Sequence, residues 1–210
     1  MGILSKMFSN TRKPVGKMGK MMAKSMNGSS HARMADWGMQ YLPDGLTGII
    51  ETACDFGCGG GRNVGELLKK YPNANVKGFD YSEVSVETSK EYNVAEIERG
   101  RCEIIQGDVS NVTLPPESID LATAFETNYF WPGLEKCFGE IYRTLKPGGT
   151  FLIVNEADGE DGKNEKWEKI IDMKTYTRTQ IKAALKITGF TDIEDFHHES
   201  KSWIAVRGVK

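Results

Sequence analysis

Four acidic residues lie where four short hydrophobic stretches of this chain end. They are Asp55, Asp80, Asp108 and Glu126. Each stretch has the length and apolar character of a buried strand. In open parallel α/β sheets, ligands bind beyond the carboxyl ends of the strands, so these carboxylates should surround one site. Asp80 lies a little over 20 residues beyond a glycine turn, where a carboxylate can bind both hydroxyls of a ribose. The four acids therefore predict a site for a positively charged nucleoside.

A glycine-rich turn follows the first of these stretches. Residues 52–63 read Thr-Ala-Cys-Asp-Phe-Gly-Cys-Gly-Gly-Gly-Arg-Asn, and apolar residues at helical spacing follow them. Glycine lets the backbone turn sharply and leaves no Cβ to keep a ligand away, and the helix behind it offers unpaired N–H groups. A dinucleotide-binding turn has the spacing G-x-G-x-x-G, but position 62 here is arginine. Asp55 would also repel a pyrophosphate but could pair with a cationic amine, so the turn favours an amine-bearing ligand over NAD.

Several segments resemble the class I S-adenosylmethionine-dependent methyltransferases. Residues 55–61 resemble the first motif of that family, and residues 145–154 resemble its helix–turn–strand segment before the fifth strand. The resemblance covers residues 50–155 in the right order and is closest to the small-molecule branch of the type 11 and type 25 methyltransferases. It implies a doubly wound, Rossmann-like α/β fold. Its seven-stranded sheet would have the order 3-2-1-4-5-7-6 with strand 7 antiparallel.

The resemblance also implies S-adenosylmethionine as the cofactor. In the family, the glycine turn holds the methionine end of the cofactor, the acid after the second strand binds the ribose, and the acid after the third strand binds the adenine amino group. Phe125 and Glu126 would flank the sulfonium. The positions that this implies for cofactor binding are Asp55, Gly57, Cys58, Gly59, Gly61, Asp80, Tyr81, Asp108, Val109 and Phe125.

Methyl transfer needs a nucleophile held in line with the C–S bond, and a general base only if that nucleophile is protonated at neutral pH. Glu126, Tyr129 and His31 are the candidate bases, and no spacing distinguishes between them. Aromatic faces attract a sulfonium, so an aromatic residue after the fourth strand could hold cofactor or substrate instead. The candidate substrate-binding residues are Trp37, Tyr41, Trp131 and Asn155.

Residues 1–45 differ in composition from the rest of the chain. From Met1 to Ala35 there are seven Lys or Arg residues and no acid, and methionines alternate with lysines around position 20. We expect a helical cap whose flexible methionines pack over a methyltransferase domain of residues 46–210. A basic amphipathic helix on a membrane surface is the alternative interpretation.

A helix is predicted over residues 31–42, closed by Pro-Asp-Gly. Its apolar residues could simply belong to the core. Alternatively, His31, Trp37 or Tyr41 could reach the ligand from a lid. Further helices are expected from Ser82 to about Arg99, over 164–173 and over 179–188, and residues 190–197 and 202–209 should form an antiparallel hairpin at the sheet edge.

Composition excludes several classes of protein. The chain has 210 residues, a net charge of −2 and no apolar run long enough to span a bilayer. The acidic body argues against a nucleic-acid surface. Four cysteines without paired C-x-x-C spacing indicate reduced thiols in a cytoplasmic protein. No metal is expected: His197 and His198 lack a third ligand nearby in sequence, although a cluster of Glu126, Glu156 and Asp158 is conceivable.

The sequence thus predicts an enzyme that transfers a methyl group from S-adenosylmethionine to a small-molecule acceptor. A non-catalytic module that senses S-adenosylmethionine and an NAD-dependent oxidoreductase are the alternatives. The acceptor, its reacting atom and the oligomeric state stay open.

Overall fold

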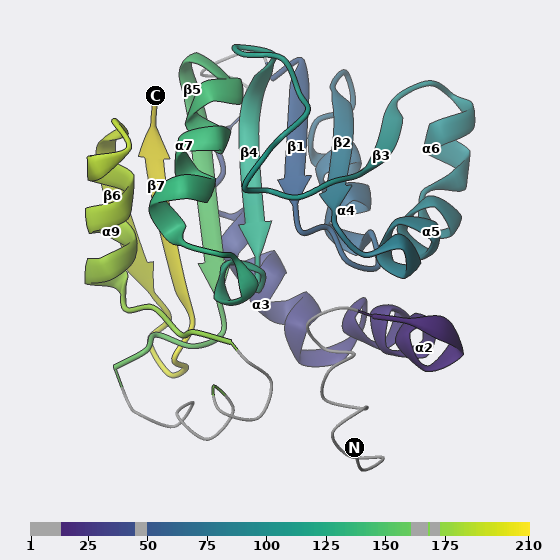
Figure 1. Cartoon of the computed structure of the whole chain (residues 1–210), viewed down its shortest axis with the longest axis horizontal. Helices are drawn as coiled ribbons and strands as arrows, with labels where there is room; N and C mark the ends of the chain where they lie inside the picture. Colours follow the sequence, from purple (N-terminus) through teal and green to yellow (C-terminus); the bar gives the residue numbers. More distant parts are fainter. Residues whose placement is uncertain (1–13, 45–49, 161–167, 169–172) are drawn as a thin grey trace.

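The structure of this protein is a computed structural model that describes residues 14–44, 50–160, 168 and 173–210. Its centre is one seven-stranded sheet, shown in Figure 1. The strands are β1 (Thr52–Phe56), β2 (Asn75–Asp80), β3 (Cys102–Gln106), β4 (Ile119–Phe125), β5 (Leu145–Asn155), β6 (Thr191–His197) and β7 (Ile204–Val209). The helices named below are α2 (Gly16–Met26), α3 (Ser29–Met39), α4 (Arg62–Lys70), α5 (Glu83–Tyr92), α6 (Val94–Glu98), η1 (Asn128–Phe130), α7 (Leu134–Thr144) and α9 (Arg178–Ile187).

The strand order is β3-β2-β1-β4-β5-β7-β6, as the sequence predicts. β1 lies between β2 and β4 and is parallel to both, with Asp55 opposite Gly78 on one side and Thr123 on the other. β7 is antiparallel to β5 and to β6, which confirms the predicted hairpin at the sheet edge. The carboxyl ends of the parallel strands therefore meet at one edge, at the lower side of the sheet in Figure 1.

Helices cover both faces of the sheet because successive side chains of a strand point to opposite faces. On one face, Phe151 and Ile153 of β5 pack with apolar residues of α7 and α9, which lie in front of the sheet in Figure 1. On the other face, Leu152 and Val154 pack with apolar residues of α3, α4 and α5. Both faces are apolar, as in a parallel sheet buried between two layers.

The helix predicted from Ser82 to Arg99 is two helices, α5 and α6, that meet at Asn93. The buried amide of Asn93 donates to the carbonyl of Gly61 at 2.9 Å and to that of Ser89 at 3.0 Å. A side chain that bonds backbone carbonyls in this way competes with the regular helix. The Asn93 side chain, at the break between the two helices, thus connects the end of α5 to the glycine turn. The helix predicted over 164–173 falls mostly outside the described residues.

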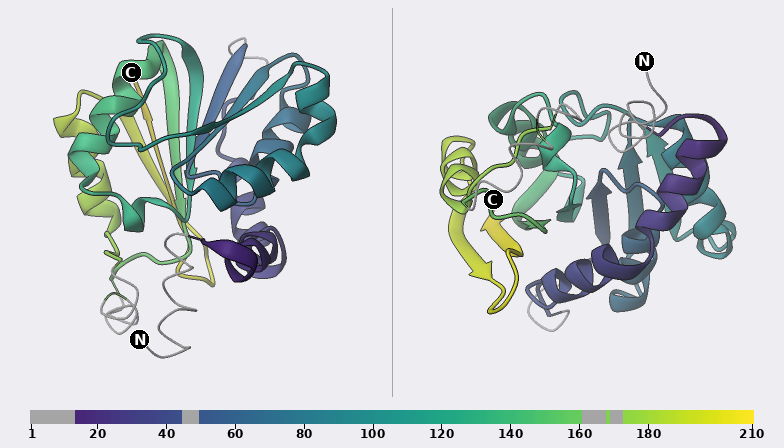
Figure 2. Two further views of the ribbon diagram at one scale, coloured as in Figure 1. Left: turned by 45° about the vertical axis from the view of Figure 1, so that its right-hand side comes forward. Right: turned by 90° about the horizontal axis from the view of Figure 1, so that it is seen from below.

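Two N-terminal helices lie beside the carboxyl ends of the strands (Figures 1 and 2). α3 begins two residues before the predicted start and ends at Met39. α2 packs on α5, where Lys20 and Lys24 both form salt bridges with Glu91. Asn27 donates its amide to the carbonyl of Gly60 at 2.8 Å, which fastens the end of α2 to the glycine turn. Among the described residues no helix has the length and hydropathy needed to cross a bilayer.

The close packing of α2 on the glycine turn leads to a testable expectation. A Cβ at Gly60 would collide with the backbone carbonyl oxygen of Ala23 and with the side chain of Asn27. We therefore expect Gly60→Ala to displace α2 and to raise the rate of tryptic cleavage after Lys20 and Lys24 by about tenfold, because cleavage follows the population of the opened segment. Mass spectrometry of timed digests measures this rate.

Gly139→Ala in α7 is the matched control, because a Cβ there meets nothing within 4 Å. It should leave the digestion pattern as it is in the unchanged chain. Equal digestion of the Gly60 variant and the control would show that α2 does not depend on this contact.

Candidate functional site

The glycine turn holds three glycines in the left-handed region, where a side chain would be strained. The φ angles of Gly57, Gly59 and Gly61 are 83°, 51° and 85°. The N–H of Gly57 donates to the carbonyl of Phe79 at 2.6 Å, which ties the turn to the end of β2. A Cβ at Gly57 would also collide with Thr127, whereas one at Gly59 would meet nothing within 4 Å. Bare backbone at Gly59 therefore borders open space.

Asp80 connects the end of β2 to this turn. One carboxylate oxygen accepts a hydrogen bond from the N–H of Gly59 at 2.9 Å, and the other accepts one from the N–H of Ser82 at 2.9 Å. The residue is 7% exposed, and burial raises the pKa of its carboxyl although these hydrogen bonds lower it. The backbone donors hold the carboxylate in one orientation at the end of the strand.

A cavity of about 230 Å³ opens between the glycine turn, the ends of β2 and β4 and the N-terminal helix α2. Most of the residues predicted to bind the cofactor line it. They are Gly57, Gly59, Asp80, Tyr81, Asp108, Val109 and Phe125, with Glu126 and Trp131 beside them. Asp108 also accepts a hydrogen bond from the N–H of Ser110 at 2.8 Å, so it caps its own turn while it faces the cavity.

Three residues predicted to bind the cofactor lie elsewhere. Cys58 lines a smaller neighbouring cavity, and its thiol donates to the hydroxyl of Ser89 at 3.8 Å. Gly61 is the residue before α4 and packs against Ser89. Asp55 is 1% exposed behind the turn, where it accepts a hydrogen bond from the hydroxyl of Thr123 at 2.7 Å. That these three residues contact a ligand directly stays a prediction.

The other carboxylate oxygen of Asp55 is buried and has no hydrogen-bond partner in the part of the chain that the structure describes. Burial raises the pKa of this carboxyl from its ordinary 3.8 to about 7, while the Thr123 hydrogen bond lowers it. The folded state then binds a proton that the unfolded state has released. Stability from this group is therefore full below pH 4 and is lost as the pH rises through about 7.

We accordingly expect Asp55→Asn to weaken the pH dependence of stability. The shift corresponds to roughly 4 kcal/mol between pH 4 and pH 8, because each pKa unit is worth about 1.4 kcal/mol. Denaturant unfolding at pH 4 and at pH 8 measures it. The loss of stability between these two pH values should be clearly smaller in the variant than in the unchanged chain, and equal losses would show that Asp55 titrates as it does in water.

Glu126 lies at the end of β4 in an unusual conformation, with a φ of 56°. Its carboxylate accepts a hydrogen bond from the hydroxyl of Tyr129 at 2.9 Å and another from the N–H of Glu156. The N–H of Ala157 donates to the same Tyr129 hydroxyl at 3.3 Å. Burial, with a smaller contribution from the nearby Glu156 carboxylate, raises the pKa of Glu126 to about 7, although the hydrogen bonds from the Glu156 N–H and the Tyr129 hydroxyl lower it. Glu126 is thus a carboxyl that can exchange a proton near neutral pH.

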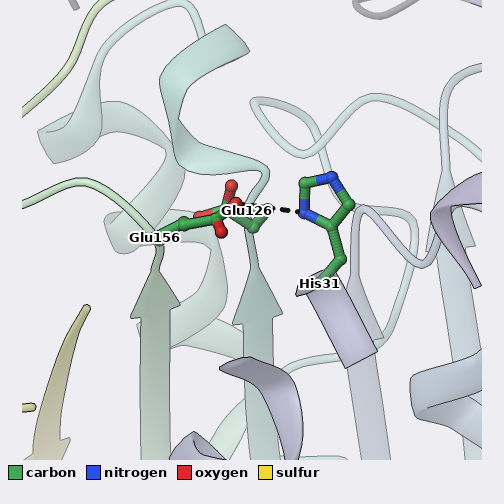
Figure 3. Close-up of side chains that lie close together, drawn as sticks. All are labelled: His31, Glu126 and Glu156. Atoms are coloured by element: carbon green, nitrogen blue, oxygen red, sulfur yellow. Dashed lines mark hydrogen bonds and ion pairs between the residues drawn. The ribbon is translucent and has the colours of Figure 1, made fainter. Parts of the chain in front are cut away.

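His31 approaches this carboxylate pair from the first turns of α3 (Figure 3). Its Nδ1 lies 3.4 Å from a carboxylate oxygen of Glu156. One ligand atom from each of His31, Glu126 and Glu156 lies within 4.8 Å of the others, so the three could also hold a divalent cation. All three candidate bases of the sequence analysis therefore belong to one cluster, which borders the predicted cofactor cavity through Glu126.

The predicted substrate-binding residues lie in different places. Trp131 lines the cavity beside Gly59 and donates its indole N–H to Thr127 at 3.2 Å. Trp37 and Tyr41 face the β6–β7 hairpin, where Tyr41 stacks on Phe196 with a ring separation of 3.9 Å. Asn155 is fully buried at the end of β5, and neither polar atom of its amide has a hydrogen-bond partner among the described residues.

Sequence reasoning missed the residues that α2 and the loops add to the cavity wall. They are Pro14, Ala23, Met26 and Gly107, together with Phe79 of β2 and Ser85 of α5. Thr127, Phe130 and Pro132 also line the cavity, and they belong to the polar and aromatic run after the fourth strand that the sequence places at the pocket. The methionine-rich composition of the N-terminal segment was the available signal for Met26. The hydroxyl of Ser82 donates to the carbonyl of Pro14 at 2.9 Å, a contact between distant segments that no local pattern reveals.

Comparison with known proteins places this geometry in context. Residues 54–153 match a family model described as a methyltransferase domain. A sterol 24-C-methyltransferase of Neurospora crassa is 30% identical over 155 residues, which are 69% of this chain and 40% of that protein. A sterol 24-C-methyltransferase of Aspergillus fumigatus is 28% identical over 152 residues, with the same shares of the two chains. The chain thus spans about two fifths of the length of these relatives.

Solved structures share the fold at lower identity. A SAM-dependent methyltransferase from Aquifex aeolicus has a TM-score of 0.72 and 18% identity, with 90% of this chain and 97% of that chain covered. Geranyl diphosphate C-methyltransferase from Streptomyces coelicolor A3(2), solved with Mg²⁺, geranyl-S-thiolodiphosphate and S-adenosyl-L-homocysteine, has a TM-score of 0.73 and 13% identity. The alignment covers 85% of this chain and 75% of that chain.

Proposed function

This chain belongs to the class I S-adenosylmethionine-dependent methyltransferase family, and from that premise we propose that it transfers the cofactor's methyl group to a small-molecule acceptor. The observation that carries the proposal is the juxtaposition of Asp80, Gly59 and Glu126 on one cavity. An oriented carboxylate, bare backbone and a carboxyl with a pKa of about 7 line the same cavity.

The described residues fit the cofactor that the family uses. The Asp80 carboxylate offers charged acceptors to the two ribose hydroxyls, and the open space beside Gly59 admits a ligand next to the main chain. Asp108 would accept a hydrogen bond from the adenine amino group, with Val109 against the ring. When bound, S-adenosylmethionine supplies an already activated methyl group, so that this chain must orient the acceptor, exclude water and accept a proton.

Glu126 is the residue proposed to accept that proton. It lines the cavity, and its raised pKa lets it hold or release a proton close to neutral pH. The hydroxyl of Tyr129 and the N–H of Glu156 fix the position of its carboxylate, so these two groups position the base. Phe125, Phe130 and Trp131 give the remaining wall an apolar character that keeps water away from the reacting atoms.

Three features support a small organic acceptor. The cavity wall is largely apolar, and the main body of the chain is acidic, which disfavours nucleic acid. The relatives named above are methyltransferases of a sterol and of geranyl diphosphate. Because the chain spans only part of the sterol enzymes, their acceptor is not transferred to it.

Turnover provides the test of this function. The protein is incubated with S-adenosylmethionine labelled in its methyl group and with a metabolite extract, and mass spectrometry follows S-adenosylhomocysteine and labelled products. We expect S-adenosylhomocysteine to form together with a labelled small molecule. Cofactor binding without any product in extracts that support other methyltransferases would favour a sensing module, and preferential binding of NAD would contradict the proposal.

A further inference from the structure

A second cleft, separate from the cofactor cavity, lies between α3 and the turn of the β6–β7 hairpin. It has a volume of about 600 Å³. Residues of three segments line it: Arg33 and Trp37 from α3, Glu156 from the end of β5, and His198, Lys201 and Trp203 from the hairpin. Nothing in the proposed cofactor site accounts for this cleft.

Three rings form one wall of the cleft. The rings of Trp37 and Trp203 are 6.1 Å apart, and the ring of His198 lies 5.6 Å from the first and 4.8 Å from the second. Tyr41 supports the wall from behind, edge-on to Trp37 at 5.2 Å and stacked on Phe196. The rings are thus held by packing, and their exposed faces offer flat apolar area to a ligand.

Two cationic side chains border these rings without a salt bridge to any residue that the structure describes. They are Arg33 on α3 and Lys201 in the hairpin turn. Their neighbours in the same region are paired: Arg207 with Glu194, and His197 with Asp158. Glu156 is the carboxylate of the cleft lining, and it is already 3.4 Å from His31. The described residues that line the cleft thus include two cationic side chains and one carboxylate, which favours an anionic group of a ligand.

The cleft leads toward the proposed base. Glu156 lines the cleft, and its N–H donates to the carboxylate of Glu126, which lines the cofactor cavity. Figure 3 shows the side chains of Glu156, Glu126 and His31 directed toward one another. A ligand held among the rings could therefore present its far end to this cluster.

We propose that this cleft binds the methyl acceptor, and that the acceptor is a planar aromatic or conjugated molecule carrying a carboxylate or a phosphate. The rings stack on the planar part, while Arg33 and Lys201 bind the anionic group. The end of the acceptor that takes the methyl group then lies at Glu156 and Glu126. The identification of the bound molecule as the methyl acceptor rests on the proposed function. Its binding to the cleft can be measured without turnover.

Isothermal titration calorimetry with three naphthalene probes tests the proposal on the full chain. The probes are 1-naphthoate, 1-naphthyl phosphate and 1-naphthylmethylamine. We expect one or both anions to bind at least about tenfold more tightly than the cationic amine, as charge-assisted pairing requires. The preferred anion identifies whether the acceptor carries a carboxylate or a phosphate.

Variants locate the binding site. Arg33→Gln and Lys201→Gln should each weaken binding of the preferred anion by about tenfold, and Trp203→Leu should weaken binding of every probe that binds. Arg99→Gln, just after α6, and Lys69→Gln on α4 are matched controls that should bind like the unchanged chain, and circular dichroism confirms that each variant is folded. Equal affinity for the amine, no binding of either anion, or unchanged affinity in both charge variants would overturn the proposal. If binding follows the prediction but no methyl transfer is found, the cleft is a binding site for aromatic anions and the proposed function is wrong.

Discussion

Replacing Asp80 by alanine is expected to weaken the binding of S-adenosylmethionine by about 2–4 kcal/mol, or about 30-fold to 1,000-fold in Kd. The reason is that two buried ribose hydroxyls would lose their charged acceptor. The structure adds a second reason, because the same carboxylate accepts hydrogen bonds from Gly59 and Ser82 and so orders the glycine turn. Calorimetric titration of the variant with S-adenosylmethionine measures the loss.

Two controls distinguish the loss of the contact between Asp80 and the cofactor from a loss of the fold. Asp192→Ala removes an exposed aspartate from the far edge of the sheet and should leave cofactor affinity unchanged. Thermal unfolding of the Asp80 variant shows whether the fold survives the loss of the two backbone contacts. If the variant is folded and binds S-adenosylmethionine as tightly as the unchanged chain, Asp80 does not belong to the cofactor site.

The second large effect is expected for Glu126→Gln, which should lower kcat by about 10²- to 10⁴-fold, the usual contribution of a positioned general base. Glutamine has the same shape and can still accept hydrogen bonds from Tyr129 and Glu156, but it cannot take a proton. For the unchanged chain, kcat should rise with pH and level off above about pH 7, because Glu126 acts in its ionised form and its pKa is about 7. Steady-state assays between pH 5.5 and 8.5 measure both effects.

Three further measurements distinguish the loss of a general base from other causes of a low kcat. Cofactor affinity of the glutamine variant should stay within about threefold, because the amide preserves the cavity wall. Tyr129→Phe, which removes only the hydroxyl that positions the carboxylate, should lower kcat by much less, about tenfold. Loss of activity on treatment with a chelator would instead indicate that His31, Glu126 and Glu156 act by holding a cation, and an unchanged pH profile in the glutamine variant would contradict the role of Glu126 as base.

The sequence was informative wherever one local feature determines structure. Short apolar strands that end in acids and alternate with amphipathic helices predict a parallel sheet, and the comparisons and topology confirm its order. The glycine turn was equally readable, because Gly57 and Gly59 have positive φ angles that other residues rarely adopt. The position of Asp80 beside that turn, on the cavity wall, followed from its spacing, since topology fixes where consecutive strands end.

Features that depend on contacts between distant segments could not be predicted from the sequence. Asp55 is adjacent to the glycine turn in sequence, yet the alternation of side chains along β1 directs it toward Thr123 of β4. Trp37 and Tyr41 were expected as either core or lid residues. They pack against the core, and there they meet aromatic residues of the hairpin about 160 positions later. Composition could not show this, because the partner of an apolar helix face depends on tertiary packing.

The most direct test of the whole account is a crystal structure of the protein with S-adenosylhomocysteine. We predict that the nucleoside lies in the cavity beside Gly59, with its ribose hydroxyls within hydrogen-bonding distance of the Asp80 carboxylate and its sulfur on the Glu126 side. A complex in which the ligand binds elsewhere, or in which its ribose does not reach Asp80, would contradict the account.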